Sequence, residues 1–497
     1  MEGLMPVRYV KEYSAEFHVE RQGRTHRKEL LWGDPCEVIE NAVDGRTKVW
    51  ARGEEGWVNS EDLGDESLLE IYVIDVGQGD GVLVKTPDGK WHLVDAGVSN
   101  ESQMTKKGAA NFLRWKFYED LRREEVDLDN VILSHPDFDH YGGLLNLLRG
   151  HLPAAGGPAR DFKIRVKNFY HSGMGRFAGE DPLGGTMKGK VAEFPQGFHG
   201  IRETGTFITE LLDGVSDFRE PKRAFAEPFS ELADLVSRVP ENVRRLTASD
   251  QHLPGYAPDE NACTVSVLGP IVEQLDNGSE GLRWLTDKSK TRNGHSIVLR
   301  LDYGNARVLL TGDLNEESQQ LLLSYQPRES FAVDVAKGCH HGSDDIDLQF
   351  VKAMGARATI VSSGDNEDYA HPRPRVLGAS ARYGREALDV GGKVLPPLLY
   401  STELARSVKL AYASRISVRG APGGALVDIN VDVDHPIVSP TGKEDRPRPL
   451  ARAALAVDLV YGLVNVRTDG KTILLATLEE KGSEFDIRVF QAGESPA

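Results

Sequence analysis

Three features are scarce in this chain, and each scarcity excludes a class of protein. Only three cysteines occur in 497 residues, Cys36, Cys263 and Cys339, and they are far apart and odd in number. We therefore expect no disulfide framework, and we expect the protein to lie in a reducing compartment. No stretch approaches the ~18 consecutive apolar residues that a membrane span needs. The first residues also lack the basic segment and apolar core of a signal peptide. We expect a cytoplasmic protein without a membrane span.

Positive charge is the third scarce feature. Lysine and arginine number 59 against 76 aspartates and glutamates, which gives a formal net charge of −17. This balance argues against a protein that holds nucleic acid on a broad basic surface. A nucleotide or phosphodiester substrate stays compatible with it, because a bound dication reverses the sign of the local field. The length favours two or three domains.

The first 67 residues consist of short strand-like runs separated by turn signals, which predicts a small all-β barrel. The segments LLWGDPCEVIE and KVWARGEEGWVNSEDL resemble bacterial Src-homology-3-like domains. Trp32, Trp50 and Trp57 are candidate contacts for a protein or peptide partner of this barrel. The alternative is that they are core aromatics of a small domain, and this interpretation is the preferred one.

Residues 68–385 alternate strand-like and helix-like segments, which indicates a layered α/β domain. Within this domain, residues 151–255 read as a long insertion without strong chemistry, and a lid over the site is one use for it. Residues 386–497 are expected to form a β-rich C-terminal extension.

One loop carries an unusual density of metal-capable side chains. Residues 131–133 look like the end of a buried strand, and His135, Asp137, Asp139 and His140 follow within a few positions. Imidazole and carboxylate together suit Zn²⁺, Mn²⁺ or Fe²⁺. Four such groups exceed what one tetrahedral ion takes from a single loop while it keeps an open position, so two ions are expected. An incidental acidic surface loop is the alternative.

The same arrangement recurs at other strand ends. His295 starts an apolar strand, Asp313 follows the next one, and His340 and His341 follow a third. His371 comes after a fourth. A single histidine at a strand end is usually a solvated loop residue, whereas the repetition indicates a shared site.

These segments together resemble a known family. DVGQGDG, LVDAG, SHPDFDHYGG, LLTGD, HHGS and a final HP occur in the order found in the metallo-β-lactamase superfamily. The most similar branch is the one that contains the hydrolase domain of the DNA-uptake channel ComEC. The match spans about residues 69–380. It implies a four-layer αββα sandwich with metals at one edge, between the two sheets.

The resemblance also implies roles for individual residues. Asp137 stands where the family usually has a second histidine, and a carboxylate there lets Mn²⁺ or Fe²⁺ compete with Zn²⁺, the expected metal. The alternative effect of this carboxylate is a first site so weakened that a single ion stays bound. Of His340 and His341, the first is preferred as a ligand. The implied ligands are His135, Asp137 and His295 for one ion, Asp139, His140 and His340 for the other, and Asp313 as the bridge between the two.

The activity implied is hydrolysis by a water molecule activated between the two ions. Asp139, His341 and His371 take the catalytic roles, with a histidine protonating the leaving group. The expected substrate is a nucleotide, a short single-stranded nucleic acid or another small phosphodiester. An ester, lactone or amide hydrolase of the same fold is one alternative. A binding or scaffold protein with a structural metal site is the other.

Four further residues were considered for the site. Two of them are candidates for supporting the expected ligands, and two have an ordinary structural interpretation. Asp80 in GQGDG and Asp95 in LVDAG are candidates for orienting ligands through hydrogen bonds, although Asp95 is equally well explained as a turn residue. His171 is expected to be an ordinary loop histidine, and Cys339 a small buried residue.

Overall fold

The computed structural model describes most of the chain. The described residues are 6–103, 108–153, 159–195, 201–364, 371–403, 407–409, 415–419, 426–430, 452–454, 462–478 and 484–493. They divide into two compact units, Met1–Glu403 with Val460–Ala497, and Leu404–Leu459. In the second unit, β28 (Ser407–Lys409) pairs with β31 (Arg452–Ala454), and β29 (Arg415–Arg419) pairs with β30 (Leu426–Asn430).

The N-terminal segment forms a seven-stranded antiparallel sheet with a core of its own. Phe17, Val49 and Val58 are fully buried in that core. Trp32 is buried, and Trp50 donates its indole N–H to the carbonyl of Glu119 outside the sheet. The partner expected for this sheet stays a prediction. In sheet order the strands are β3 (Arg24–Leu31), β2 (Ser14–Arg21), β6 (Glu54–Asn59), β5 (Arg46–Ala51), β4 (Pro35–Val43), β1 (Val7–Val10) and β7 (Leu63–Gly64), and a 3₁₀ turn, η1 (Ser60–Asp62), precedes β7.

A nine-stranded mixed sheet follows. Its strands β10, β11, β14 and β17 are parallel neighbours, so their carboxyl ends meet at one edge. In sheet order the strands are β17 (Asn242–Arg245), β14 (Ile164–His171), β11 (Val126–Leu133), β10 (Trp91–Ala96), β9 (Gly81–Lys85), β8 (Leu69–Val73), β32 (Val464–Thr468), β33 (Thr472–Leu478) and β34 (Phe485–Gln491).

A six-stranded sheet packs face to face on the nine-stranded one. Val82 and Ile132 of the larger sheet share a buried cluster with Val308 and Ile360 of the smaller sheet. Strands β22, β23, β24 and β27 are parallel neighbours, so this sheet also gathers carboxyl ends at one edge. In order the strands are β18 (Cys263–Gly269), β21 (Val298–Tyr303), β22 (Ala306–Leu310), β23 (Val335–Lys337), β24 (Ala358–Val361) and β27 (Leu398–Ser401).

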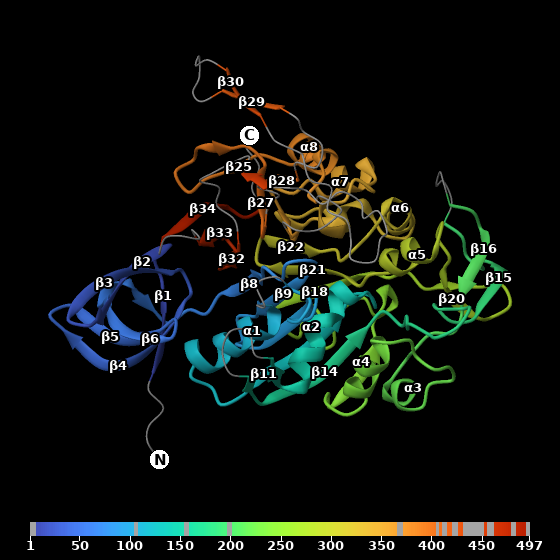
Figure 1. Cartoon of the computed structure of the whole chain (residues 1–497), viewed down its shortest axis with the longest axis horizontal. Helices are drawn as coiled ribbons and strands as arrows, with labels where there is room; N and C mark the ends of the chain where they lie inside the picture. Colours follow the sequence, from blue (N-terminus) through green and yellow to red (C-terminus); the bar gives the residue numbers. More distant parts are fainter. Residues whose placement is uncertain are drawn as a thin grey trace. The chain divides into compact units, whose positions relative to one another are not determined.

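Helices cover the outer face of each sheet, as Figure 1 shows. The nine-stranded sheet carries α1 (Ala109–Arg114), which continues as a π-helical turn, η2 (Trp115–Asp120), and also α2 (Phe138–Arg149), α3 (Val215–Arg219) and α4 (Phe229–Val236). The six-stranded sheet carries α6 (Glu316–Tyr325), α7 (Leu348–Met354) and α8 (Pro374–Tyr383).

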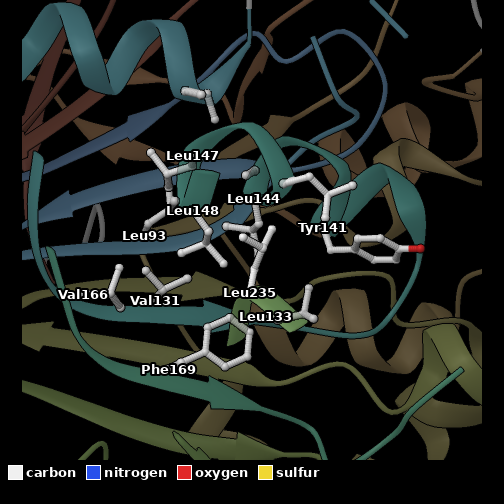
Figure 2. Packing of buried hydrophobic residues seen from close by; sticks show 14 of the residues in the cluster. Leu93, Val131, Leu133, Tyr141, Leu144, Leu147, Leu148, Val166, Phe169 and Leu235 are labelled. Atoms are coloured by element: carbon white, nitrogen blue, oxygen red, sulfur yellow. The ribbon is translucent and has the colours of Figure 1, made fainter. Parts of the chain in front are cut away.

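The side chains between these layers are buried apolar residues. Leu144 and Leu147 of α2 lie over Val131 and Phe169 of the nine-stranded sheet (Figure 2). Leu309 of β22 belongs to the cluster under the helices on the other side. Three apolar clusters thus separate four layers, and the expected αββα sandwich is confirmed.

The structure revises two of the expected boundaries. Strands β14 and β17 lie inside the expected insertion of residues 151–255, yet they extend the nine-stranded sheet. Strands β27 and β32 to β34 come from the expected C-terminal extension, and they complete both sheets. What does stand apart is a four-stranded sheet of β15 (Thr186–Lys190), β16 (Thr204–Ile208), β20 (Glu280–Arg283) and β19 (Glu273–Gln274).

Short elements complete the described chain. Two small hairpins pair β12 (His151–Leu152) with β13 (Arg160–Asp161) and β25 (Ala387–Leu388) with β26 (Val394–Leu395). The remaining helical segments are η3 (Ala248–Asp250), α5 (Lys288–Gly294), η4 (Arg328–Phe331) and η5 (Cys339–Gly342). Among the described residues, no helix combines the length and apolar character required to cross a membrane.

Candidate metal centre

The expected site residues follow the ends of parallel strands in both sheets. Asp95 lies at the end of β10, and His135 follows β11. Asp313 follows β22 in the other sheet, and His341 follows β23. Because the carboxyl ends of parallel strands meet at one edge, loops distant in sequence come together there.

Two glycines let the loops approach closely. Gly79 of the DVGQGDG segment has a φ of +101°, and a Cβ there would collide with the carbonyl oxygen of Asp139. A Cβ on Gly143 of α2 would collide with the carbonyl oxygen of Ala96. The glycines of both motifs therefore bring the first turn of α2, which carries Asp139, against the ends of β9 and β10.

Three histidines and two carboxylates converge at this edge. Asp313 Oδ2 lies 3.3 Å from His140 Nε2 and 3.0 Å from His341 Nε2. His341 Nε2 lies 3.7 Å from Asp139 Oδ2. His135 joins His140 and Asp313 in a group whose ligand atoms all lie within 4.8 Å of one another, and Asp139, His140 and His341 form a second such group.

Hydrogen bonds at Nδ1 orient two of these imidazoles. His140 Nδ1 is 2.8 Å from Asp95 Oδ2, and Asp95 is itself held in the left-handed region at a φ of 56°. His135 Nδ1 is 3.2 Å from the hydroxyl of Ser296, which also accepts the backbone N–H of Asp313. Each ring thereby turns its Nε2 toward the centre.

His341 is oriented from the opposite side. Its Nδ1 is 3.1 Å from the carbonyl oxygen of Ser362 and 3.2 Å from Asp80 Oδ1. Asp80 forms an ion pair with the buried ammonium of Lys337, which also donates to the carbonyl of Gly312 at 3.2 Å. Asp80 and Asp95 therefore contact imidazoles of the convergent groups, and their role in orienting metal ligands stays a prediction.

The atoms that face the centre fit a divalent cation. Nε2 of His135, His140 and His341 and Oδ1 of Asp313 are buried and have no hydrogen-bond partner within the described chain. A neutral imidazole that donates from Nδ1 presents a lone pair at Nε2, and a carboxylate or carbonyl behind it is the usual support of a histidine ligand. The donor set of imidazole and carboxylate suits Zn²⁺, Mn²⁺ or Fe²⁺.

The pKa values of His140, His341 and Asp313 are shifted by their mutual contacts. Burial opposes the charge on His140 and His341, but Asp313 together with Asp95 and Asp80 outweighs it. The pKa of His140 is raised well above its usual range and that of His341 to about 10. Burial likewise disfavours the charged form of Asp313, yet His341 and His140 hold its pKa well below the usual value. A metal ion bound at these atoms would compete with protons, so metal binding is expected to release them.

The neighbouring histidines are arranged differently from the sequence-based preference. His341, and not His340, belongs to the convergent groups, so the preference for His340 as the ligand is revised. Both residues lie in the left-handed region, at φ values of 46° and 52°. His340 Nε2 lies 3.7 Å from Asp313, and the ring of His371 is 6.0 Å from that of His340. His340 and His371 thus border the centre.

Besides His340, two expected ligands lie outside the convergent groups of the described residues. His295 donates from Nε2 to the carbonyl of Arg283 at 2.7 Å, and burial lowers its pKa to about 4. Asp137 lies 3.8 Å from His135 Nε2 but forms ion pairs with Arg292 and Arg176. The half of the centre that His135, Asp137 and His295 were expected to build is therefore not assembled as a ligand set.

Three charged residues of the site have weak sequence signals. Lys337 ends the mostly apolar segment VDVAK, and a lysine at the end of a buried strand is a sequence signal for a buried ion pair. No sequence pattern distinguishes Arg176 and Arg292 from other arginines of the chain. Cys339 is buried, as expected, and burial raises the pKa of its thiol to about 11. His171 was expected in a loop but is the buried last residue of β14, where burial lowers its pKa to about 3 among aromatic rings.

Asp95 provides a first test of this geometry. In Asp95→Asn the His140 Nδ1–H loses a charged acceptor while the side chain keeps its size. We expect the affinity for Mn²⁺ to fall about 10- to 100-fold, the usual cost of losing such a support. Calorimetric titration of the metal-free protein measures this, and Asp302→Asn on β21 is the matched control. Unchanged affinity in Asp95→Asn would contradict the assignment of His140 as a ligand.

Comparison with known proteins agrees with this geometry. Residues 74–226 match the Metallo-beta-lactamase superfamily. The chain is 32% identical over 326 residues to ComE operon protein 3 of Bacillus subtilis, which covers 64% of this chain and 31% of that protein. It is 31% identical over 116 residues to competence protein ComA of Neisseria gonorrhoeae. That match covers 23% of this chain and 17% of that protein. The chain thus spans less than a third of the length of these relatives.

A solved structure is also similar. The metallo-beta-lactamase fold protein YhfI from Bacillus subtilis is 14% identical, with a TM-score of 0.27 over 59% of this chain and 85% of that one. The family match and the convergent histidines and aspartates rest on different observations. Residues 74–226 are therefore similar to the Metallo-beta-lactamase superfamily, and the histidines and aspartates that the structure brings together could hold a metal ion.

Proposed function

We propose that the chain is a metal-dependent phosphodiesterase that acts on a nucleotide, a short single-stranded nucleic acid or another small phosphodiester. The observation that carries the proposal is the convergence of three unpartnered Nε2 atoms on Asp313 at the edge between the two sheets. A divalent ion bound there supplies an acidified water, with a pKa lowered from 15.7 to about 7, and polarises the phosphoryl oxygen.

The chain's own residues prepare the reaction in two ways. Asp95, Asp80 and Ser296 fix the ligand imidazoles, so little reorganisation is needed when substrate binds. His371 and His340 border the same centre. Burial and the nearby His341 lower the pKa of His371 to about 4. His371 is therefore neutral at pH 7, where it is suited to accept a proton or hydrogen-bond to the leaving oxygen more than to act as a charged acid.

A phosphodiester is favoured over a neutral ester or lactone by charge at the site. Arg292 and Arg176 form ion pairs with Asp137, in the loop of residues 135–140 that carries expected ligands. They place positive charge there in a protein of formal charge −17. Guanidinium groups match the geometry of phosphate oxygens.

The experiment is a substrate screen with metal removal. The full chain is stripped with a chelator, reloaded with Mn²⁺ or Zn²⁺, and assayed on bis-p-nitrophenyl phosphate, a single-stranded DNA oligonucleotide and a lactone. We expect turnover of the phosphodiesters only, lost on stripping and restored by reloading. His151→Ala, an exposed histidine on β12, is the matched control and should behave as the natural chain. Turnover of the lactone alone would establish the alternative hydrolase, and tight metal binding without any turnover would indicate a structural site.

A further inference from the structure

The carboxylate of Asp137 is fully engaged by neighbouring side chains. The Arg292 guanidinium forms an ion pair with Oδ1, and Arg176 Nη1 lies 3.3 Å from the same oxygen. In the amide orientation that satisfies both ends of Asn293, its Nδ2 donates to Asp137 Oδ2 at 2.9 Å. Both oxygens therefore already have donors.

The subsite around Asp137 also lacks ligands. The 3.8 Å between His135 Nε2 and Asp137 Oδ2 would admit an ion. The third expected ligand, His295, is committed to the carbonyl of Arg283 and joins no convergent group in the described chain. A catalytic ion usually takes three protein ligands. Among the residues that the structure describes, His135 and the Asp137 carboxylate are the candidates at this position, and His135 already joins the group of His140 and Asp313.

Arg292 brings a positive charge to this position. Its side chain is 17% exposed, and its charge is among the causes that lower the pKa of His135, after burial and His140. Within the part of the chain that the structure describes, its terminal Nη atoms make no hydrogen bond. A cation with free donors thus stands beside the ligand loop, on the side of His135.

We propose that the guanidinium of Arg292, held by Asp137, takes the place of the first metal ion. The centre then holds one resident divalent ion, among His135, Asp139, His140, Asp313 and His341. Arg292, with Arg176 at the rim, binds the anionic oxygens of the substrate. The inference rests on the proposed function for the identity of that substrate, and it replaces the expected pair of ions with one ion and one arginine. Two parallel N–H donors of a guanidinium match two phosphate oxygens.

Metal content tests the first half of the inference. The full chain is loaded with excess Mn²⁺, desalted and measured by mass spectrometry of the metal per chain. We expect one ion in the natural chain and still one in Asp137→Asn, because Asp137 holds an arginine and no metal. Asp139→Asn, its neighbour on the same loop, is expected to lower the content. Two ions in the natural chain, or the loss of an ion in Asp137→Asn, would overturn the inference.

Phosphate binding tests the second half. Inorganic phosphate is titrated calorimetrically into the Mn²⁺-loaded chain. We expect Arg292→Gln to weaken binding about 10- to 100-fold, as for the loss of charge-assisted hydrogen bonds, with the metal content unchanged. Arg292→Lys keeps the positive charge but lacks the paired N–H donors of the guanidinium. Its phosphate affinity should therefore lie between those of the natural chain and Arg292→Gln. The matched control is Arg165→Gln, an exposed arginine on β14 that pairs with Glu241. Equal phosphate affinity in Arg292→Gln and the natural chain would refute the role.

The two proposals fail separately. If the natural chain cleaves no phosphodiester but holds one ion and binds phosphate through Arg292, the inference stands and the proposed function falls. If phosphodiesters are cleaved and Arg292→Gln leaves the KM unchanged, the proposed function stands and the inference falls. Thermal unfolding of each variant shows whether it is folded, and the lysine variant separates the loss of phosphate binding from a purely structural effect.

Discussion

Asp313→Asn is expected to lose most of the bound metal and to reduce turnover by more than about a hundredfold. Asp313 is 2% exposed, and its Oδ2 lies within 3.3 Å of both His140 Nε2 and His341 Nε2. The substitution removes the negative charge at the point where the ligands of the two sheets meet. Losing a support behind a ligand already costs about 10- to 100-fold, and Asp313 faces the centre itself.

Metal content and turnover of bis-p-nitrophenyl phosphate are measured on the same preparation of Asp313→Asn. Asp302→Asn, a half-buried aspartate on β21 of the same sheet, is the matched control and should keep both. Retention of full metal content and turnover in Asp313→Asn would contradict the centre described here, whatever the substrate. Loss of turnover with full metal content would place Asp313 among the groups that act on the substrate.

The sequence predicts the centre well where local chemistry decides it. His135, His140 and Asp313 stand directly after apolar strands, and the rule that parallel strands present their carboxyl ends at one edge brings them together. The close approach of Gly79 to Asp139 and of Gly143 to Ala96 is a long-range contact that the structure reveals. The strand-end positions need no knowledge of distant contacts, which is why the loop of residues 135–140 could be predicted. The αββα layers were expected from the resemblance of the motifs to the metallo-β-lactamase superfamily.

Other features depend on backbone geometry or on long-range pairing, which no local pattern carries. His340 and His341 are adjacent and both lie in the left-handed region, and the sequence does not show that His341 Nε2 lies nearer to Asp313, at 3.0 Å against 3.7 Å for His340. Asp137 is drawn to Arg292, a residue 155 positions further along the chain. In the same way β32 pairs with β8 across nearly the whole domain, so the expected C-terminal extension proves to be part of the larger sheet.

The ion pair of Arg357 and Asp334 has the largest expected effect on stability. Their side chains are 0% and 2% exposed, at the amino ends of β24 and β23. Asp334 also accepts the backbone N–H groups of Arg307 at 3.0 Å and Gly493 at 3.2 Å, so it joins the six-stranded sheet to the end of β34. We expect Asp334→Ala to lower the free energy of unfolding by about 3–5 kcal/mol, because it leaves a guanidinium buried without its carboxylate.

A double variant separates the buried charge from the other losses. In Asp334→Ala/Arg357→Met both charges are gone and a side chain of similar volume remains, so part of the lost stability should return. The return should be incomplete, since the backbone N–H groups of Arg307 and Gly493 still lack their acceptor in the double variant. Urea denaturation followed by tryptophan fluorescence measures all three chains. Asp302→Ala, which breaks the half-buried pair with Arg300, should cost about 1 kcal/mol or less. If the double variant were no more stable than Asp334→Ala, uncompensated charge would not be the cause, and the role of Asp334 would lie in its backbone contacts alone.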